Sequence, residues 1–510
     1  METQIAAVSM RNVTKTFGSV IANEKVSLDI YKGEILALLG ENGSGKTTLM
    51  NMLSGIYFPD EGHILINGKE EVIKSPKDAL RLGIGMVHQH FKLIDVLSAT
   101  ENIILGLEGK LNVKEASKKI EDICSKYGFE VDPKQKIYDM SVSQKQTVEI
   151  VKVLYRGADI LILDEPTAVL TPQEADRLFN VLRKMRDDGK AIIIITHKMQ
   201  EVQSLSDRVA VLRDGKYIGS LTTKDTDVNE MTNMMVGHEV TLNIERPEPV
   251  DPKPRIEVQG LNVRNEEGIL KLKDVSFTAN SGEILGIAGI SGCGQKELLE
   301  AIAGLQVTES GAIYYVEEDG SKEMLIGKDP LEIADMGVSL SFVPEDRLGM
   351  GLVGNMDIID NMMLRSFRRG HTPFVNRKPP KELAESIVEH LEVVTSGIST
   401  PVRRLSGGNV QKVLVGREIA SAPRVLLTAY AVRGLDINSC YTIYELLNEQ
   451  KKKGVAVVFV GEDLDVLLQL SDRIMVLCGG EVSGIVDART TDKNTLGMMM
   501  TRVEGGEQHE

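Results

Sequence analysis

The sequence predicts an α/β fold that is built twice along the chain, each time around a mainly parallel sheet. Short apolar runs such as EILALLG, DILILDEP and KAIIIITH alternate with helical patterns such as EADRLFNVLRKMRDDGK. This alternation is typical of parallel sheets covered by helices, with chemistry at the ends of the strands. Segments of the first half also recur in the second half at a fixed spacing, so we expect two domains in the 510 residues.

The repeat defines which residues of the two halves correspond. VSLDIYKGEILALLGENGSGK matches VSFTANSGEILGIAGISGCGQ, which pairs Gly40 with Gly289 at a spacing of 249 residues. DMSVSQKQTVEIVKVLYRGADILIL matches RLSGGNVQKVLVGREIASAPRVLLT, which pairs Ser141 with Ser406 at a spacing of 265 residues. Four of the sixteen prolines lie in ERPEPVDPKPR, residues 245–255. A proline-rich stretch favours an extended spacer, so we expect domains over 1–244 and 256–510 joined by this linker.

Composition and charge exclude several classes of protein. The chain is 42% hydrophobic and 26% charged, as in globular proteins, and its net charge of −15 argues against nucleic acid as the main partner. The N-terminus lacks the apolar core of a secretory signal, and no apolar run approaches the length of a membrane span. The four cysteines lie far apart without CxxC spacing, which favours buried thiols in a reducing compartment.

A phosphate-binding loop is predicted in the first half. The segment fits G-x-x-x-x-G-K-[ST] after a predicted strand and at the start of a predicted helix, which is the context that this motif requires. Its glycines let backbone N–H groups approach phosphate oxygens, its lysine reaches the β- and γ-phosphates, and the first hydroxyl binds Mg²⁺. The predicted ATP-binding residues are Gly40, Glu41, Asn42, Gly43, Ser44, Gly45, Lys46, Thr47 and Thr48.

Two carboxylates follow the apolar strand ILIL. Asp164 is expected to hold Mg²⁺, together with Thr47, and Glu165 to polarise the attacking water. His197 follows another apolar strand and is expected to contact the γ-phosphate; the alternative is a structural histidine at a strand end. Gln89 offers a neutral amide to the metal or the water. Its neighbours His88 and His90 have the spacing of a metal pair, but a surface loop is favoured.

These motifs, in this order, together with LSGGN at 405–409, resemble the ATP-binding cassette (ABC) superfamily. The resemblance covers nearly the whole chain and implies two P-loop NTPase domains arranged head to tail. Each ATP is then enclosed between the P-loop of one domain and the signature of the other. In the second half that signature supplies Ser406, Gly407 and Gly408, with Asn409 where glutamine is more usual. Phe17 matches the aromatic residue that stacks on adenine; the alternative is a core aromatic residue.

The tandem arrangement with FVPEDR at 342–347 is similar to the ATPases of bacterial sugar and nucleoside importers. YGFEVDP and DEPTAVLTPQE favour the nucleoside importers, and a ribose- or galactose-type importer is the alternative. The resemblance implies two membrane permease subunits and an extracytoplasmic substrate-binding lipoprotein as partners. It places the chain at the cytoplasmic face of the cell membrane, docked around Gln89 and HFKLIDVLSATEN, without contact to the transported solute.

The two halves have lost complementary parts. In the second half Gln295 and Lys296 occupy the positions of Lys46 and Thr47, while Ala429, Tyr430 and Glu462 occupy those of Asp164, Glu165 and His197. The first signature has Val142 and Ser143 in place of both glycines. We therefore expect one hydrolytic site per chain, formed by the first P-loop and the second signature.

The sequence argues against two rival functions. A soluble tandem cassette acting in translation would carry two competent sites and basic segments for RNA, neither of which this sequence has. A nucleotide sensor without turnover conflicts with the intact Asp164–Glu165 pair.

Overall fold

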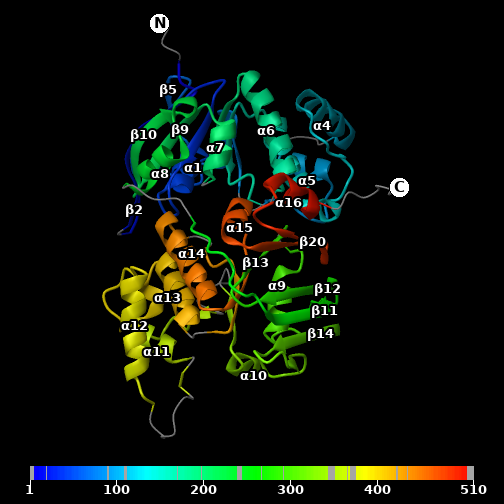
Figure 1. The fold of residues 1–510 in the computed structure, drawn as a ribbon. Coiled ribbons are helices and arrows are strands. Elements are labelled where there is room, and N and C mark those ends of the chain that lie inside the picture. The colour runs from blue at the N-terminus through cyan, green and yellow to red at the C-terminus, as the bar shows by residue number, and fades with distance from the viewer. Residues whose placement is uncertain are drawn as a thin grey trace. The chain divides into compact units, whose positions relative to one another are not determined.

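The chain separates into two compact units in the computed structural model, Met1–Thr241 and Leu242–Glu510 (Figure 1). The structure describes residues 5–18, 20–88, 91–107, 112–168, 170–196, 198–237, 244–265, 267–290, 292–342, 351–364, 366–367, 375–420, 423–432 and 435–501. Each unit contains one mainly parallel sheet and one antiparallel sheet. The predicted duplicated α/β fold is therefore confirmed.

The parallel sheet of the first unit has the strand order β10-β9-β3-β8-β7-β6, and only β10 runs antiparallel to its neighbour. Its strands are β3 (Ile35–Leu39), β6 (Ile84–Val87), β7 (Ile160–Asp164), β8 (Ala191–Ile195), β9 (Arg208–Arg213) and β10 (Lys216–Thr222). Every residue of β3, β7 and β8 is buried, which explains why these strands are continuous apolar runs.

The second unit repeats this sheet in the order β16-β17-β18-β13-β19-β20. Its strands are β13 (Ile284–Gly289), β16 (Val338–Phe342), β17 (Val425–Ala429), β18 (Ala456–Val460), β19 (Arg473–Cys478) and β20 (Glu481–Asp487). Strands β17 and β18 are buried along their whole length, like β7 and β8 in the first unit. The two parallel sheets thus have equivalent cores.

Each unit also contains an antiparallel sheet, which the sequence patterns did not predict. In the first unit its order is β2-β1-β4-β5 and in the second unit β12-β11-β14-β15. The strands are β1 (Val8–Phe17), β2 (Val20–Ile30), β4 (Glu61–Ile66), β5 (Lys69–Glu71), β11 (Pro254–Arg264), β12 (Leu270–Asn280), β14 (Thr308–Val316) and β15 (Lys322–Met324). Register shifts interrupt the pairing of β1 with β2 and of β11 with β12, so their apolar residues do not alternate regularly.

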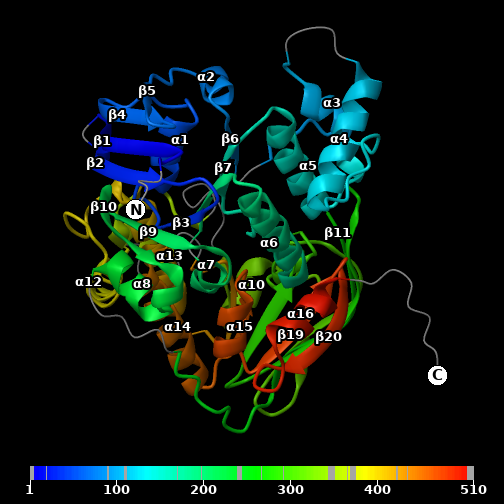
Figure 2. The same ribbon diagram turned by 90° about the horizontal axis from the view of Figure 1, so that it is seen from above.

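The helices of the first unit include a group, α3, α4 and α5, that lies apart from β1, β2 and β4 (Figure 2). Capping boxes begin α3, α5 and α6, as expected for helices that start at Ser or Thr. The helices are α1 (Lys46–Leu53), α2 (Pro76–Arg81), α3 (Ala99–Ile104), α4 (Val113–Tyr127), α5 (Val142–Tyr155), α6 (Pro172–Asp187), α7 (Met199–Leu205) and α8 (Val228–Val236), with 3₁₀ turns at Ile137–Asp139 and Thr223–Asp225.

The second unit carries the corresponding group α11, α12 and α13, apart from β11, β12 and β14 (Figure 1). Its helices are α9 (Gln295–Ile302), α10 (Pro330–Asp335), α11 (Ile358–Met363), α12 (Lys378–His390), α13 (Gly407–Ala420), α14 (Ile437–Lys452), α15 (Leu464–Leu470) and α16 (Lys493–Met500), with a 3₁₀ turn at Val402–Arg404.

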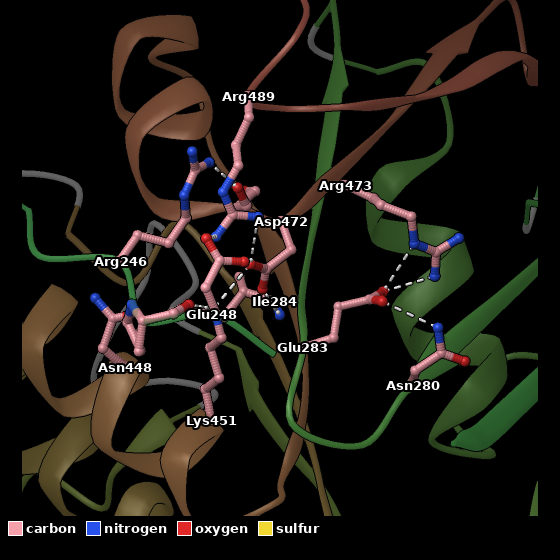
Figure 3. A network of polar contacts seen from close by, with 12 residues as sticks. Arg246, Glu248, Asn280, Glu283, Ile284, Asn448, Lys451, Asp472, Arg473 and Arg489 are labelled. Atoms are coloured by element: carbon pink, nitrogen blue, oxygen red, sulfur yellow. Dashed lines mark hydrogen bonds and ion pairs between the residues drawn. The ribbon is translucent and has the colours of Figure 1, made fainter. Parts of the chain in front are cut away.

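The beginning of the predicted linker packs on the second unit. Asn448 and Lys451 of α14 donate hydrogen bonds to the carbonyls of Glu245 and Pro247, and Arg246 donates to the carbonyls of Leu468 and Ser471 (Figure 3). The chain from Pro254 onward already forms β11. The proline-rich segment is therefore part of the second compact unit in the structure, because its backbone carbonyls and Arg246 bond to that unit.

The linker covers a buried ion pair that has an exposed counterpart in the first unit. Lys451 Nζ lies 2.8 Å from Asp472 Oδ1, and both side chains are at most 3% exposed. Asp472 also accepts the Ile284 N–H at 2.9 Å, at the start of β13 (Figure 3). In the first unit Asp207 accepts the Ile35 N–H in the same way and pairs with Arg186, but those two side chains are 37% and 26% exposed.

Substituting Lys451 with methionine is expected to destabilise the second unit by about 3 kcal/mol, because Asp472 then stays buried without its closest cation. The matched change Arg186→Met should cost no more than about 1 kcal/mol, since its ion pair is exposed to solvent. Urea unfolding of the full chain, followed separately for each unit by hydrogen exchange, measures both values. Equal losses of unfolding free energy in the two variants would contradict the claim that burial makes the Lys451–Asp472 pair the more costly one to break.

Candidate active site

The predicted phosphate loop connects β3 to α1 and requires glycine at its close approaches. Gly45 has φ +91°, and a Cβ there would lie 2.2 Å from the Ala22 carbonyl oxygen. A Cβ on Gly40 would lie 2.3 Å from the Leu212 carbonyl oxygen. The buried Ser44 hydroxyl has no hydrogen-bond partner within the part of the chain that the structure describes. A buried hydroxyl of this kind in a glycine-rich loop fits a phosphate oxygen.

Lys46 lies inside this loop. Its Nζ donates to the carbonyls of Gly40 at 2.7 Å and Glu41 at 2.9 Å. Burial lowers the pKa of Lys46, while the charges of Glu165, Asp164 and Glu41 oppose that shift. The ammonium therefore contacts two loop carbonyls, and the charges of the two carboxylates predicted for the metal and the water act on it.

Thr47 and Asp164 meet beside the loop. Thr47 Oγ1 donates to Asp164 Oδ2 at 3.2 Å, which joins the start of α1 to the end of β7. Burial, together with the charge of Glu165, raises the pKa of Asp164 to about 6. A buried carboxylate next to a hydroxyl oxygen suits a hard divalent cation, which prefers oxygen ligands.

No group of three or more His, Cys, Asp or Glu side chains within the described ranges could hold a metal ion. A cation at Thr47 and Asp164 would thus need phosphate oxygens or water to complete its ligands. That ligand set is the usual one for Mg²⁺ bound with a nucleotide.

Glu165 occupies a strained backbone position directly after β7. Its φ is +47°, and its N–H donates to the Ile195 carbonyl of β8 at 2.9 Å. Tyr430, the equivalent residue of the second unit, has φ +55° and donates its N–H to the Val460 carbonyl at 3.2 Å. The two backbones therefore match, and the side chain is what differs: a carboxylate in one unit and a phenol in the other.

Gln89 and His197 lie outside the described residues. Strands β6 and β8, which precede them in the sequence, pair on either side of β7 in parallel register. The ends of β6, β7 and β8 therefore share the edge of the sheet at which Asp164 lies.

Phe17 lies at the end of β1 and is not a core residue. Its side chain is 45% exposed, and its ring meets Tyr57 edge to face at a centroid distance of 5.1 Å. The ammonium of Lys15 lies 5.5 Å from the ring centre. The alternative of a core aromatic residue is thereby wrong, because β1 leaves this ring at the surface.

Sequence patterns missed two residues around the loop. Tyr57 follows α1 and packs on Phe17, and the fully buried Asn23 of β2 donates its amide to the Gly45 carbonyl at 3.2 Å. Neither residue belongs to a recognisable motif. Both reach the loop only through the tertiary fold, Asn23 from β2 and Tyr57 from the turn after α1. The one hint was the polar Asn23 within a strand.

The second unit retains the loop backbone but not its chemistry. Gln295, at the position of Lys46, is buried and donates its amide to the Ile290 carbonyl at 3.1 Å. Lys296, at the position of Thr47, is half exposed, and its ammonium lies 3.7 Å from Glu300 on α9. Ala429 ends β17 where Asp164 ends β7. The second unit therefore lacks the ammonium of Lys46, the hydroxyl of Thr47 and the carboxylate of Asp164 at the equivalent positions.

The signature segments begin α13 and α5. Ser406 and Gly407 are exposed, and a Cβ on Gly408 would lie 3.8 Å from Leu435, an ordinary contact. Asn409 donates its amide to Ser406 Oγ at 2.8 Å and accepts the Val394 N–H at 2.9 Å, so it fixes the serine hydroxyl. In the first unit Ser141 forms a capping box with Gln144, with Val142 as the first helical residue.

The repeated α/β fold and the intact first loop define a P-loop ATPase with two tandem units. The chain matches the ABC transporter family over residues 23–168 and 272–428. It is 42% identical to the nucleoside import ATP-binding protein NupA of Lactococcus lactis subsp. cremoris, over 97% of each chain. It is 40% identical to the guanosine import ATP-binding protein NupO of Bacillus subtilis over 98% of each chain, and 37% identical to the ribose import ATP-binding protein RbsA 2 of Escherichia coli O157:H7 over 97% of each.

The chain belongs to the ABC transporter family and is an ATP-binding ATPase. The resemblance inferred from its motifs is confirmed. No helix within the described ranges is both long and apolar enough to cross a membrane.

Proposed function

We propose that this ABC ATPase energises the uptake of nucleosides through two membrane permease subunits, which receive the solute from an extracytoplasmic substrate-binding lipoprotein. The main support is the 42% and 40% identity, over nearly the full length, to proteins named for nucleoside and guanosine import. The ribose import relative, at 37%, makes monosaccharide uptake the second candidate. The ATPase would act at the cytoplasmic face of the membrane without touching the solute.

The first unit would carry the hydrolytic chemistry. Lys46 binds the β- and γ-phosphates, Glu165 polarises the attacking water, and His197 contacts the γ-phosphate. Thr47, Asp164 and Gln89 would hold Mg²⁺, whose charge would offset that of the phosphates. The 3.2 Å contact between Thr47 and Asp164 supports this ligand pair. Phe17 would stack on adenine, and its exposed ring beside Tyr57 supports that role.

The second unit would close the site of the first in a head-to-tail arrangement. Ser406, Gly407 and Gly408 would cap the γ-phosphate with hydroxyl and amide groups. The exposed Ser406 and Gly407 at the start of α13 support this role. The other site would combine the altered loop at Gln295 with the altered signature at Val142, so one site per chain would hydrolyse ATP.

The permease would dock on the segment that follows Gln89. Ile94 and Val96 in this segment are 44% and 69% exposed, so their apolar side chains are available for contact with a partner. Leu105, at the end of α3, is 47% exposed as well. A permease that contacts these apolar side chains, beside the helices α3, α4 and α5, would transmit its movement to the segment that follows Gln89.

Transport in proteoliposomes tests the substrate. The chain is purified with its permeases and lipoprotein, and ATP-driven uptake of radiolabelled guanosine is compared with that of ribose. Guanosine uptake is expected, and Lys46→Ala should abolish it. Uptake of ribose alone would assign the monosaccharide role instead. Sedimentation of the chain with ribosomes, and not with membrane proteins, would contradict an importer altogether.

A further inference from the structure

Two charged residues on α5 belong to none of the ATP-binding motifs. Glu149 is 5% exposed, and its Oε2 lies 3.5 Å from Lys152 Nζ, one turn further along the helix. Burying such a pair is costly unless both groups make further hydrogen bonds. Glu149 and Lys152 both make further hydrogen bonds, and both bond to the backbone of Lys92.

Glu149 and Lys152 hold the backbone of Lys92 from both sides. Glu149 Oε1 accepts the Lys92 N–H at 2.7 Å, and Lys152 Nζ donates to the Lys92 carbonyl at 3.1 Å. Hydrogen bonds with one charged partner are roughly twice as strong as neutral ones. The peptide groups of Lys92 are therefore fixed to the helix that begins at Val142.

The next turn of the same segment is fixed to α3. Asn102, which is 1% exposed, accepts the Ile94 N–H at 2.8 Å and donates to the Ile94 carbonyl at 3.0 Å. Lys92 follows Gln89 by three residues, a distance that the chain spans in at most about 10 Å. The backbone positions three and five residues after Gln89 in the sequence are therefore tied to α5 and to α3.

The second unit has the same arrangement with one side missing. Asn361 binds Val353 as Asn102 binds Ile94, and Arg417 donates to the Gly351 carbonyl at 2.9 Å as Lys152 donates to that of Lys92. Leu414 stands where Glu149 stands, and a Cβ on Gly351 would lie 2.7 Å from it. A leucine accepts no hydrogen bond, so the carboxylate contact occurs in the unit that keeps the complete phosphate loop.

We infer that Glu149 and Lys152 are positioning residues for ATP hydrolysis: they fix the segment that carries Gln89 to α5. The inference rests on the proposed role of Gln89. It predicts a change in kcat and little change in the KM for ATP, because Lys46 and the phosphate loop are untouched.

The test uses the full chain with its permeases and compares Glu149→Leu, which copies the second unit, with Glu149→Gln, whose amide oxygen still accepts the Lys92 N–H. Glu149→Leu is expected to lower kcat about tenfold with the KM within twofold, and Glu149→Gln to recover most of the rate. Lys145→Met is the matched control, since Lys145 joins α5 to the same segment through Asp95 in an exposed pair at 3.4 Å. Its kcat should stay within twofold of wild type.

Gln89→Ala separates the two claims. If Gln89→Ala slows hydrolysis, the double variant Gln89→Ala/Glu149→Leu should be no slower, because both changes act through one group. A wild-type rate in Gln89→Ala would overturn the role of Gln89 and, with it, the inference. A slow Gln89→Ala beside an unimpaired Glu149→Leu would overturn the inference alone, as would a further tenfold loss in the double variant. Should Glu149→Leu fail to fold, Lys152→Met replaces it with the same expected result.

Discussion

Replacing Glu165 with glutamine is expected to lower the kcat for ATP hydrolysis by at least about 100-fold, because a neutral amide cannot polarise the attacking water. ATP binding should persist, since Lys46 and the phosphate loop remain. The backbone at this position is set by the hydrogen bond from the Glu165 N–H to Ile195, which the substitution preserves. Steady-state hydrolysis and the amount of nucleotide that copurifies with the chain measure the two effects.

Tyr430→Gln is the matched control in the second unit. Tyr430 shares the positive φ of Glu165 and the hydrogen bond to the neighbouring strand, but it follows Ala429 and not an aspartate. Hydrolysis in this variant should stay within about twofold of wild type. Equal losses from the two substitutions would mean that both units hydrolyse ATP.

Replacing Lys46 with alanine is expected to weaken ATP binding at the first unit roughly 100-fold, the magnitude of a lost contact to a charged group. In this variant only the loop carbonyls of Gly40 and Glu41, which Lys46 contacts in the wild type, remain at this place. They carry no positive charge that could bind a phosphate. Gln295→Ala in the second unit removes the equivalent side chain and serves as the control. Titration of each variant with a fluorescent ATP analogue gives the affinities.

Comparable weakening in Lys46→Ala and Gln295→Ala would contradict the assignment of the functional loop to the first unit. Unchanged affinity in Lys46→Ala would contradict the phosphate contact itself. In either case the intact sequence motif would not identify the binding site.

The parts of this site that lie at the ends of buried strands could be predicted from the sequence. A continuous apolar run such as ILIL is typical of a buried parallel strand, and Asp164 and Glu165 then fall at the carboxyl-end edge of a parallel sheet. The spacing of the repeat also identified Tyr430 as the counterpart of Glu165, and the structure gives both residues the same backbone conformation.

The contacts that depend on packing between distant segments could not be predicted. Glu149 and Lys152 resemble any solvated pair three residues apart on a helix, and only the fold brings Lys92 between them. Tyr57 likewise gains its position from the turn after α1. The linker was predicted as an extended spacer because prolines exclude helix, but that argument says nothing about backbone carbonyls that accept hydrogen bonds from Asn448 and Lys451.

The proposal that one chain forms one hydrolytic site, with the ATP of the first unit closed by the signature of the second, is tested most directly by placing a carboxylate in each signature. Gly407→Asp and Val142→Asp are compared in the complex with the permeases, by hydrolysis and by ATP binding. A carboxylate next to the γ-phosphate repels it in a site that excludes water. We expect Gly407→Asp to reduce hydrolysis as far as Glu165→Gln does while ATP still binds, and Val142→Asp to have a much smaller effect. A damaging Val142→Asp beside a silent Gly407→Asp would contradict this pairing of the two units.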